Sequence, residues 1–199
     1  MNSTRIAILG TLSHLHQQPI RYDLAELARI VAEIQPDLLG VEVDRDEFER
    51  GDLEHSPIEV RDALVPLARR SDMVVVPVGA PSPEELRPPH PGVRAALTRV
   101  LDATLQQVQT TANDARRVNS ALVSHACGLI CHLEEYTCGE RGRQAWNIAN
   151  SRILTNIVEI ARRDPGTRIL VAVQCRRKHW LEPRLRKTPA IKLVSYWEL

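Results

Sequence analysis

Aromatic side chains are scarce in this sequence, which has three Trp, three Tyr and one Phe among its 199 residues. Proteins that bind single-stranded nucleic acid usually stack the bases on exposed aromatic rings beside basic residues. The Lys and Arg residues here form no stripe interleaved with aromatic residues, and the formal net charge is only +1. Nucleic acid is therefore not an expected partner.

Secretory features are also missing. The first residues, Met-Asn-Ser-Thr-Arg, lead directly into a short apolar run, so we expect neither a signal peptide nor a membrane span. The cysteines lack paired secretory spacing, which favours free thiols in a reducing compartment over disulfides. They are Cys127, Cys131, Cys138 and Cys175. A soluble cytoplasmic protein is the resulting expectation.

Familiar catalytic motifs are absent as well. The sequence has no G-x-S-x-G elbow, no Walker loop, no dinucleotide glycine fingerprint and no H-E-x-x-H helix. Ser13 and His14 are adjacent, a placement that rarely gives nucleophile-to-base geometry. Any chemistry must therefore come from single residues that the fold brings together.

The apolar pattern predicts an α/β fold. With 43% hydrophobic and 26% charged residues, the composition is that of one globular domain. Strand and helix patterns alternate, which favours a mostly parallel sheet flanked by helices. We predict strands at residues 5–10, 38–43, 72–78, 168–173 and 191–196, and helices at 22–34, 57–70, 93–111, 114–136, 144–163 and 180–186. The chain is thus predicted to be a single domain over residues 1–199.

A helical insert is predicted at about residues 93–136. Five prolines in the segment 79–92 forbid regular structure there, so this segment is expected to be a loop that leads into the insert. Within the insert, His125 and His132 share one helix face, and Cys127 and Cys131 lie on a neighbouring face. Zinc binding is conceivable, but packing of small apolar side chains is the favoured interpretation.

Polar residues follow three of the predicted strands. The buried run 169–173 ends in Arg176, Arg177, Lys178 and His179. Ligands of open α/β sheets bind beyond the carboxyl ends of the strands, although a solvated strand exit explains the charges equally well. His14 and His16 follow the first strand, and Glu42 interrupts the apolar run 38–43. We expect His14, Glu42 and His179 to converge on one rim.

Four short motifs then resemble those of the TraB/PrgY, Tiki, ChaN and erythromycin-esterase group. Gly10-Thr11 precedes a histidine, Gln35-Pro-Asp-Leu-Leu-Gly-Val-Glu-Val43 contains an acid, Arg152 precedes Asn156 by one helical turn, and His179 follows a later strand. The group has G-T-x-H, P-D-x-(x)-x-x-E, R-x-x-x-N and G-x-x-H motifs in this order, across nearly the whole chain.

The resemblance implies a role for each matching residue. His14 stands for the first histidine, although Ser13 has the expected spacing from Gly10 and His16 competes for the role. Glu42 is the acid, and Arg152 and Asn156 match the helix motif. His179 is the second histidine, and Arg176 stands where the family has glycine.

The implied chemistry is hydrolysis of an ester or peptide bond. His14, Glu42 and His179 would hold a divalent metal, Zn, Mn or Co, that activates water, or a histidine paired with Glu42 would act as general base. Arg152 would bind an anionic group or stabilise an oxyanion. Four further residues are predicted to bind a ligand, and the arginines among them favour a carboxylate or phosphate. These are His16, Asn156, Arg176 and Arg177.

The same residues are compatible with hydrolysis or with binding alone. The chain is either a hydrolase or a non-catalytic binding or regulatory module that keeps a pocket for an anionic small molecule, peptide or haem. A third option is that residues 93–136 form an interaction surface, which would make the protein a homodimer.

Overall fold

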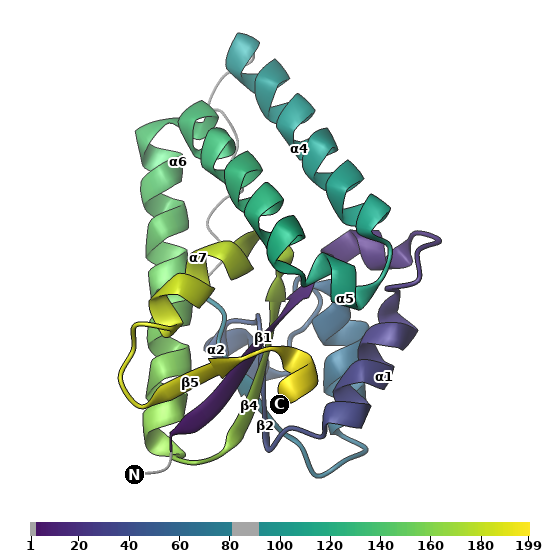
Figure 1. Cartoon of the computed structure of the whole chain (residues 1–199), viewed down its shortest axis with the longest axis vertical. Helices are drawn as coiled ribbons and strands as arrows, with labels where there is room; N and C mark the ends of the chain where they lie inside the picture. Colours follow the sequence, from purple (N-terminus) through teal and green to yellow (C-terminus); the bar gives the residue numbers. More distant parts are fainter. Residues whose placement is uncertain (1–2, 81–91) are drawn as a thin grey trace.

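A parallel five-stranded sheet forms the centre of the molecule (Figure 1). The computed structural model describes residues 3–80 and 92–199. The strands are β1 (Thr4–Thr11), β2 (Leu38–Val41), β3 (Val74–Pro77), β4 (Arg168–Gln174) and β5 (Ile191–Val194), in the spatial order β3-β2-β4-β1-β5. All four strand pairs are parallel, so the predicted single α/β domain with a parallel sheet is confirmed.

Helices and helical turns connect the strands. The α-helices are α1 (Leu24–Ile34), α2 (Arg45–Arg50), α3 (Val65–Ala68), α4 (Val93–Ala112), α5 (Ala115–Val118), α6 (Ala121–Arg163) and α7 (Cys175–Leu185). The other turns are the 3-10 helices η1 (Ser13–Gln17) and η3 (Tyr196–Glu198) and the π-helical turn η2 (Val60–Leu64). Among the described residues, no helix is both long enough and apolar enough to cross a membrane.

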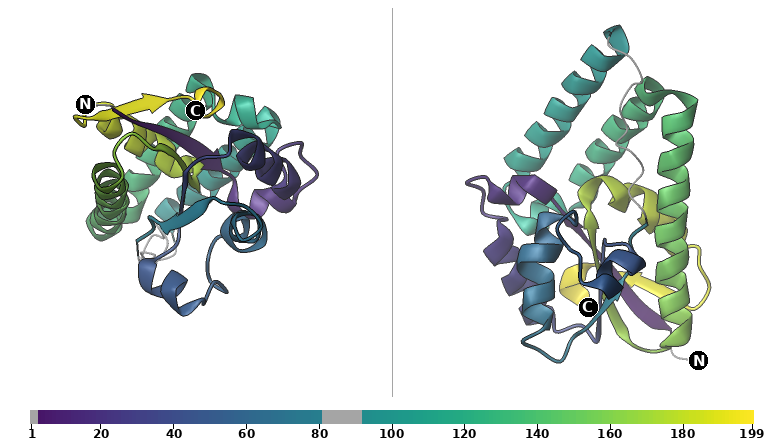
Figure 2. Two further views of the ribbon diagram at one scale, coloured as in Figure 1. Left: turned by 90° about the horizontal axis from the view of Figure 1, so that it is seen from below. Right: turned by 180° about the vertical axis from the view of Figure 1, so that it is seen from behind.

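The central strand β4 explains the two-sided core. Its apolar run pairs with β1 from Arg168 to Gln174 and with β2 on the other side. Leu170 and Ala172 face α1 and η2, whereas Ile169, Val171 and Val173 face the second half of α6 and α7. Figure 2 shows the sheet between these two helical layers. A strand covered on both faces needs apolar residues at every position, which is why this run is continuous.

Helices α4, α5 and the first half of α6 form the predicted insert. We call α4 and residues 121–138 of α6 the arm, because they extend beyond the carboxyl ends of the strands (Figure 1). The prediction of one helix over residues 114–136 is wrong in detail, since Asn119 ends α5 and Ser120 caps α6. The expected break at residues 137–142 is reduced to one non-helical residue, Gly139, with φ 74°.

Helix α7 begins five residues earlier than predicted. It starts at Cys175, directly after β4, so Arg176, Arg177, Lys178 and His179 lie on a helix and not on a loop. Arg177 and Lys178 are 7% and 4% exposed. A solvated strand exit, one of the two explanations for these charges, is therefore wrong for both residues. Long cationic side chains can be buried when other elements supply acceptors.

Candidate functional site

The carboxyl ends of β1, β2 and β4 carry a layer of buried polar side chains. Thr11, Glu42 and Gln174 occupy or follow these three strand ends. Strands β2 and β4 are neighbours, and their chains leave toward opposite faces of the sheet, because β2 leads to β3 and β4 leads to β5. Such a point is where open α/β sheets bind ligands.

An ion pair between Glu42 and Arg177 occupies this position at the edge of the sheet. One carboxylate oxygen accepts a hydrogen bond from the backbone N–H of Gln174 at 2.8 Å, and the other accepts from Nε of Arg177 at 2.5 Å. The side chains of Glu42 and Arg177 are 10% and 8% exposed. These two bonds join the end of β2 to the start of α7.

Helix α6 completes the surroundings of Arg177. Its Nη1 donates to Oδ1 of Asn150 at 2.7 Å, and its guanidinium lies 4.6 Å from the centre of the Trp146 ring. A buried ion pair repays its desolvation cost only when its remaining donors and acceptors are satisfied. The acid and the amide oxygen accept from the guanidinium, and the indole ring lies against it, whereas Nδ2 of Asn150 and Nε1 of Trp146 have no hydrogen-bond partner among the described residues. We call Glu42, Arg177, Asn150 and Trp146 the inner network.

Lys178 has a comparable structural role one residue later. Its Nζ donates to the carbonyl oxygen and to Oδ1 of Asn119, at 3.0 and 2.9 Å. Oδ1 of Asn119 also accepts from the N–H of Gly10 at 2.7 Å. Burial lowers the pKa of Lys178. This lysine therefore connects α7 to the end of β1 through α5.

Glu59 is a second acid at this edge that sequence reasoning missed. Its side chain accepts from Oγ1 of Thr11 at 2.5 Å, and its other oxygen is buried with no described hydrogen-bond partner. Burial raises the pKa of Glu59, and the nearby Glu42 adds to the increase. An acid between Ile58 and Val60 gives no local sign of this role, because acids on helices are usually solvated.

The histidines after β1 have separate environments. His14 is exposed on η1, whereas His16 is buried. Nε2 of His16 accepts from the N–H of Leu12 at 2.9 Å, which leaves Nδ1 to donate to the carbonyl oxygen of Tyr22 at 2.7 Å. Burial lowers the pKa of His16. Both ring nitrogens of His16 are therefore used to hold the turn after β1.

The side chain of His179, on α7, packs against the arm. A Cβ added at Gly128 would lie 3.1 Å from Cγ of His179, so this glycine permits the close packing of the two helices. Burial, followed by the neighbouring Arg176, lowers the pKa of His179 to about 4. Nη2 of Arg176 itself donates to the carboxyl group of Glu134, whose side chain is 1% exposed.

The expected metal ligands are not gathered in one place. Over residues 3–80 and 92–199, no group of three or more His, Cys, Asp and Glu side chains is placed to hold a metal ion. His14, Glu42 and His179 therefore do not form the expected ligand set in this structure. Metal binding, and a ligand-binding role for His16, Arg176 or Arg177, stay predictions.

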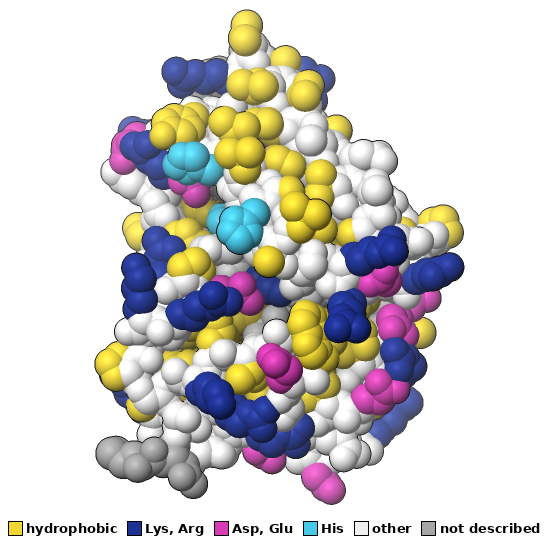
Figure 3. Space-filling model, viewed as in Figure 1, with side chains coloured by type: hydrophobic (Ala, Val, Ile, Leu, Met, Phe, Trp, Pro, Cys, Tyr) yellow, Lys and Arg dark blue, Asp and Glu magenta, His cyan; other side chains and the backbone are white. Residues whose placement is uncertain are grey.

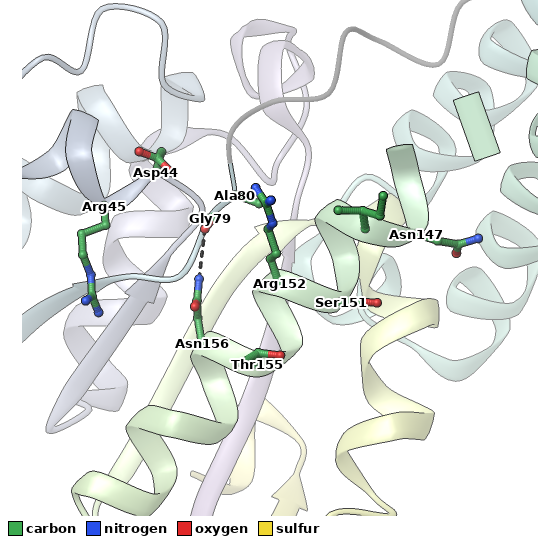
Figure 4. A pocket seen from close by; sticks show the side chains of 10 residues that line it. Asp44, Arg45, Gly79, Ala80, Asn147, Ser151, Arg152, Thr155 and Asn156 are labelled. Carbon is green, nitrogen blue, oxygen red and sulfur yellow. Dashed lines mark hydrogen bonds between the residues drawn. The ribbon is translucent and has the colours of Figure 1, made fainter. Parts of the chain in front are cut away.

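Arg152 and Asn156 do share a site. Nδ2 of Asn156 donates to the carbonyl oxygens of Val78 and Gly79, both at 3.1 Å, and so ties α6 to the chain after β3. Arg152 lies one turn earlier on the same side of α6 (Figure 4). The two residues border a groove of about 650 Å³, which we call the outer groove. It is lined by Asp44, Arg45, Gly79, Ala80, Asn147, Ile148, Ser151, Arg152, Thr155 and Asn156.

The outer groove has more unpaired positive than negative charge. Among the described residues, neither Arg45 nor Arg152 forms an ion pair with a carboxylate. The one acid among the described lining residues, Asp44, caps α2 by accepting from the N–H of Asp46 at 2.9 Å. Hydroxyl and amide groups of Asn147, Ser151 and Thr155 supply additional donors. The groove thus offers two guanidinium groups and several neutral donors.

Comparison with family models, with curated proteins and with solved structures finds no match to this chain. Kinship with the TraB/PrgY, Tiki, ChaN and erythromycin-esterase group therefore rests on the short motifs alone.

Proposed function

We propose that this protein binds an anionic small molecule in the outer groove. The observation that carries the proposal is the pair Arg152 and Asn156. Asn156 is held by two hydrogen bonds to the chain after β3, and Arg152, one turn away, has no described carboxylate partner. A fixed helix that presents an unpaired guanidinium beside hydroxyl groups suits a phosphate or a carboxylate.

Position and size support the same proposal. The groove adjoins the carboxyl edge of β2 and β3, the side of a parallel sheet where ligands bind. Its volume of about 650 Å³ lies within the usual range for small-molecule sites. A carboxylate or phosphate ester of metabolite size fits this volume, and the exposed Ile148 offers an apolar contact for its remainder.

Binding is favoured over hydrolysis by the state of Glu42. The family resemblance implies an acid that works on water or metal, but Glu42 has both oxygens bonded to Gln174 and Arg177. Hydrolysis of an ester or peptide bond would have to use a carboxylate that is only 10% exposed and is already paired with Arg177. An anion can enter the outer groove without separating such a pair.

A ligand panel separates the two functions. Pyrophosphate, citrate, an acidic peptide and haemin are titrated into the protein, and unfolding temperature is recorded with Arg152→Gln and the control Arg162→Gln, an exposed arginine on the same helix outside the groove. We expect at least one anion to stabilise the wild type and the control more than Arg152→Gln. Equal stabilisation of all three proteins would refute the proposal.

Hydrolysis is measured on the same samples. Nitrophenyl esters and peptides are incubated with the protein, alone and with Zn²⁺, Mn²⁺ or Co²⁺. Turnover that Arg162→Gln leaves intact, and that Glu42→Gln abolishes under conditions where urea unfolding shows this variant to be folded, would replace binding by hydrolysis as the function. We expect no turnover above the rate of heat-unfolded protein.

We also propose that the protein forms a homodimer through the arm. Seven of the ten exposed large hydrophobic side chains in the described part of the chain lie on it. Figure 3 shows hydrophobic side chains gathered over the upper part of the molecule, on α4 and the adjoining half of α6. They are Val93, Leu97, Val100, Leu122, Leu129, Leu133 and Tyr136. Their spacing of three, four or seven residues is that of helix-pairing seams.

The arm is large enough for such an interface. Helix α4 has 20 residues and is therefore about 30 Å long, and two adjacent helices are about 20 Å wide. One face then offers about 600 Å² per protomer, or about 1,200 Å² in a pair, which reaches the lower limit of stable interfaces. A two-fold pair of arms is the commonest closed arrangement for like chains.

Light scattering after size-exclusion chromatography tests the homodimer. Leu129→Glu places a charge on the apolar face of the arm and should yield a monomer. Gln106→Glu, at an exposed position on another side of α4, is the matched control and should stay a dimer. A monomeric wild type at micromolar concentration would refute this second proposal and leave the first untouched.

A further inference from the structure

Two buried cysteines from distant parts of the chain lie in contact. Cys127 is on the arm, and Cys175 is the first residue of α7. Their Sγ atoms are 3.8 Å apart and share a weak hydrogen bond. Both residues are at most 1% exposed. Neither the anion site nor the homodimer involves this pair.

The surroundings distinguish the two thiols. Cys175 lies at the amino end of an 11-residue helix, where the helix dipole favours a thiolate. The hydrogen bond with Cys127 and the ammonium group of Lys178 lower the pKa of Cys175 against the opposing effect of burial. The same contact raises the pKa of Cys127. The position of Cys175 at the start of α7 therefore favours it over Cys127 as the nucleophile of the pair.

The neighbouring cysteine is less suited to react. Burial raises the pKa of Cys131 to about 12, so a thiolate is disfavoured there.

Gly10 packs against Cys175 so closely that an added Cβ would lie 3.3 Å from the Cys175 Cα. This contact restricts movement of the α7 backbone, so approach of the two sulfurs depends on side-chain rotation.

We propose that Cys127 and Cys175 form a peroxide-sensitive thiol pair that closes reversibly to an intrachain disulfide. Because both thiols are buried, the step begins with a local opening between the arm and α7 that admits hydrogen peroxide. The Cys175 thiolate then attacks one oxygen of the peroxide, breaks the O–O bond and becomes a sulfenic acid, releasing hydroxide. The Cys127 thiol then attacks that sulfur, and the disulfide forms with loss of water. Two thiols are oxidised by two electrons in total, and one peroxide is reduced to two waters.

Formation of the disulfide would need only a small movement of the sulfurs and would fasten two distant parts of the chain together. A disulfide requires the sulfurs to close from 3.8 Å to about 2.05 Å, a movement of about 1.8 Å. The bond would join positions 48 residues apart and fasten the arm to α7, the helix that carries Arg177 of the inner network. Cytoplasmic disulfides that form reversibly are commonly redox sensors.

Mass spectrometry of the folded full-length protein tests the pair. The protein is exposed to excess hydrogen peroxide, unfolded, alkylated with N-ethylmaleimide and measured intact. We expect two alkylated cysteines in place of four, a peptide that contains Cys127 bonded to Cys175, and full reversal by dithiothreitol. The oxidised protein should also unfold at a higher urea concentration, because the bond restricts the unfolded chain.

Variants and a denatured sample make the result specific. Cys138→Ser should keep the disulfide, whereas Cys127→Ser should stop at a sulfenic acid on Cys175 that dimedone traps. Four alkylated cysteines after peroxide treatment of the folded protein would overturn the proposal. A disulfide between other cysteines, or one that forms only in urea, would overturn it equally.

Discussion

The inner network and the outer groove both contain arginines, but these arginines differ in what surrounds them. Arg177 is 8% exposed at its side chain and is bonded to Glu42 and Asn150. Arg152 is exposed, and no described carboxylate pairs with it. The two sites lie at the same edge of the sheet, on different sides of α6.

This difference separates folding from binding. A charge that is fully bonded inside the protein stabilises one arrangement of strands and helices, and removal of either partner leaves the other buried and unpaired. A solvated charge contributes little to stability, and it remains available to pair with a ligand. Arg177 therefore belongs to the fold, and Arg152 is available for recognition.

The largest effect is expected when the inner pair is broken. Glu42→Gln removes the charge that balances Arg177, and such losses in buried pairs cost about 3–5 kcal/mol. Urea unfolding of the variant and of Arg162→Gln measures this cost. The control should remain within about 0.5 kcal/mol of the wild type. A loss of under about 1 kcal/mol for Glu42→Gln would place this acid among the solvated groups.

The buried residues Glu134 and His179 extend the comparison of buried and solvated charges to the pH dependence of stability. Burial raises the pKa of Glu134 to about 7, with a further contribution from Asp102 and opposition from Arg176. The stability that depends on protonated Glu134 is full below its unfolded pKa of 4.5 and is lost as the pH rises to about 7. For His179, whose pKa is lowered to about 4, stability is full above 6.5 and is lost as the pH falls toward 4.

The contributions of Glu134 and His179 to the free energy of unfolding change in opposite directions between pH 4.5 and 6.5. Each changes by about 2–3 kcal/mol. Urea unfolding across this range should show a small net slope for the wild type. Glu134→Gln should lose stability as the pH falls from 6.5, and His179→Asn should lose it as the pH rises from 4.5. Identical slopes for both variants and the wild type would contradict this assignment.

A smaller effect is expected for the residue that holds the outer groove. Asn156→Ala removes two hydrogen bonds to the chain after β3, which should cost about 1–2 kcal/mol. Thr155→Ala, at the exposed neighbouring position, is the control for thermal unfolding and should change stability by less than about 0.5 kcal/mol. Equal losses in both variants would show that Asn156 does not anchor the groove.

The smallest effect on stability is expected for Arg152. Arg152→Gln and Arg45→Gln should each change the free energy of unfolding by less than about 0.5 kcal/mol, since neither guanidinium is paired in the described structure. Measurement in low and high salt sharpens the test, because solvated charges respond to screening and a buried pair responds much less. A loss above about 1 kcal/mol for Arg152→Gln would assign it to the fold.

The sequence contains enough local information for the sheet and for the placement of Arg152 and Asn156 on one side of a helix. Continuous apolar runs such as 169–173 predict buried parallel strands because side-chain burial on both faces is a local property. Arg152 and Asn156 are four residues apart, so helix geometry alone puts them on one side. The inner network is different, because the partner of Arg177 is an acid 135 positions away.

His14, Glu42 and His179 do not come together in the described structure, for the same reason. The polar residues 176–179 resemble a solvated exit unless the acceptors on α5, α6 and β2 are known, and those lie far away in the sequence. Glu134 and Glu59 gave no signal, since an acid on a helix is ordinarily solvated. Charge alone therefore did not distinguish a rim from a core.

Isothermal titration of pyrophosphate into the wild type, Arg152→Gln and Arg162→Gln tests the division between inner and outer arginines most directly. We expect Arg152→Gln to weaken binding by about tenfold, equivalent to about 1.4 kcal/mol, while its unfolding free energy and the binding by Arg162→Gln stay unchanged. Equal affinities for all three proteins, or a fall in affinity that accompanies an equal fall in stability, would contradict this division.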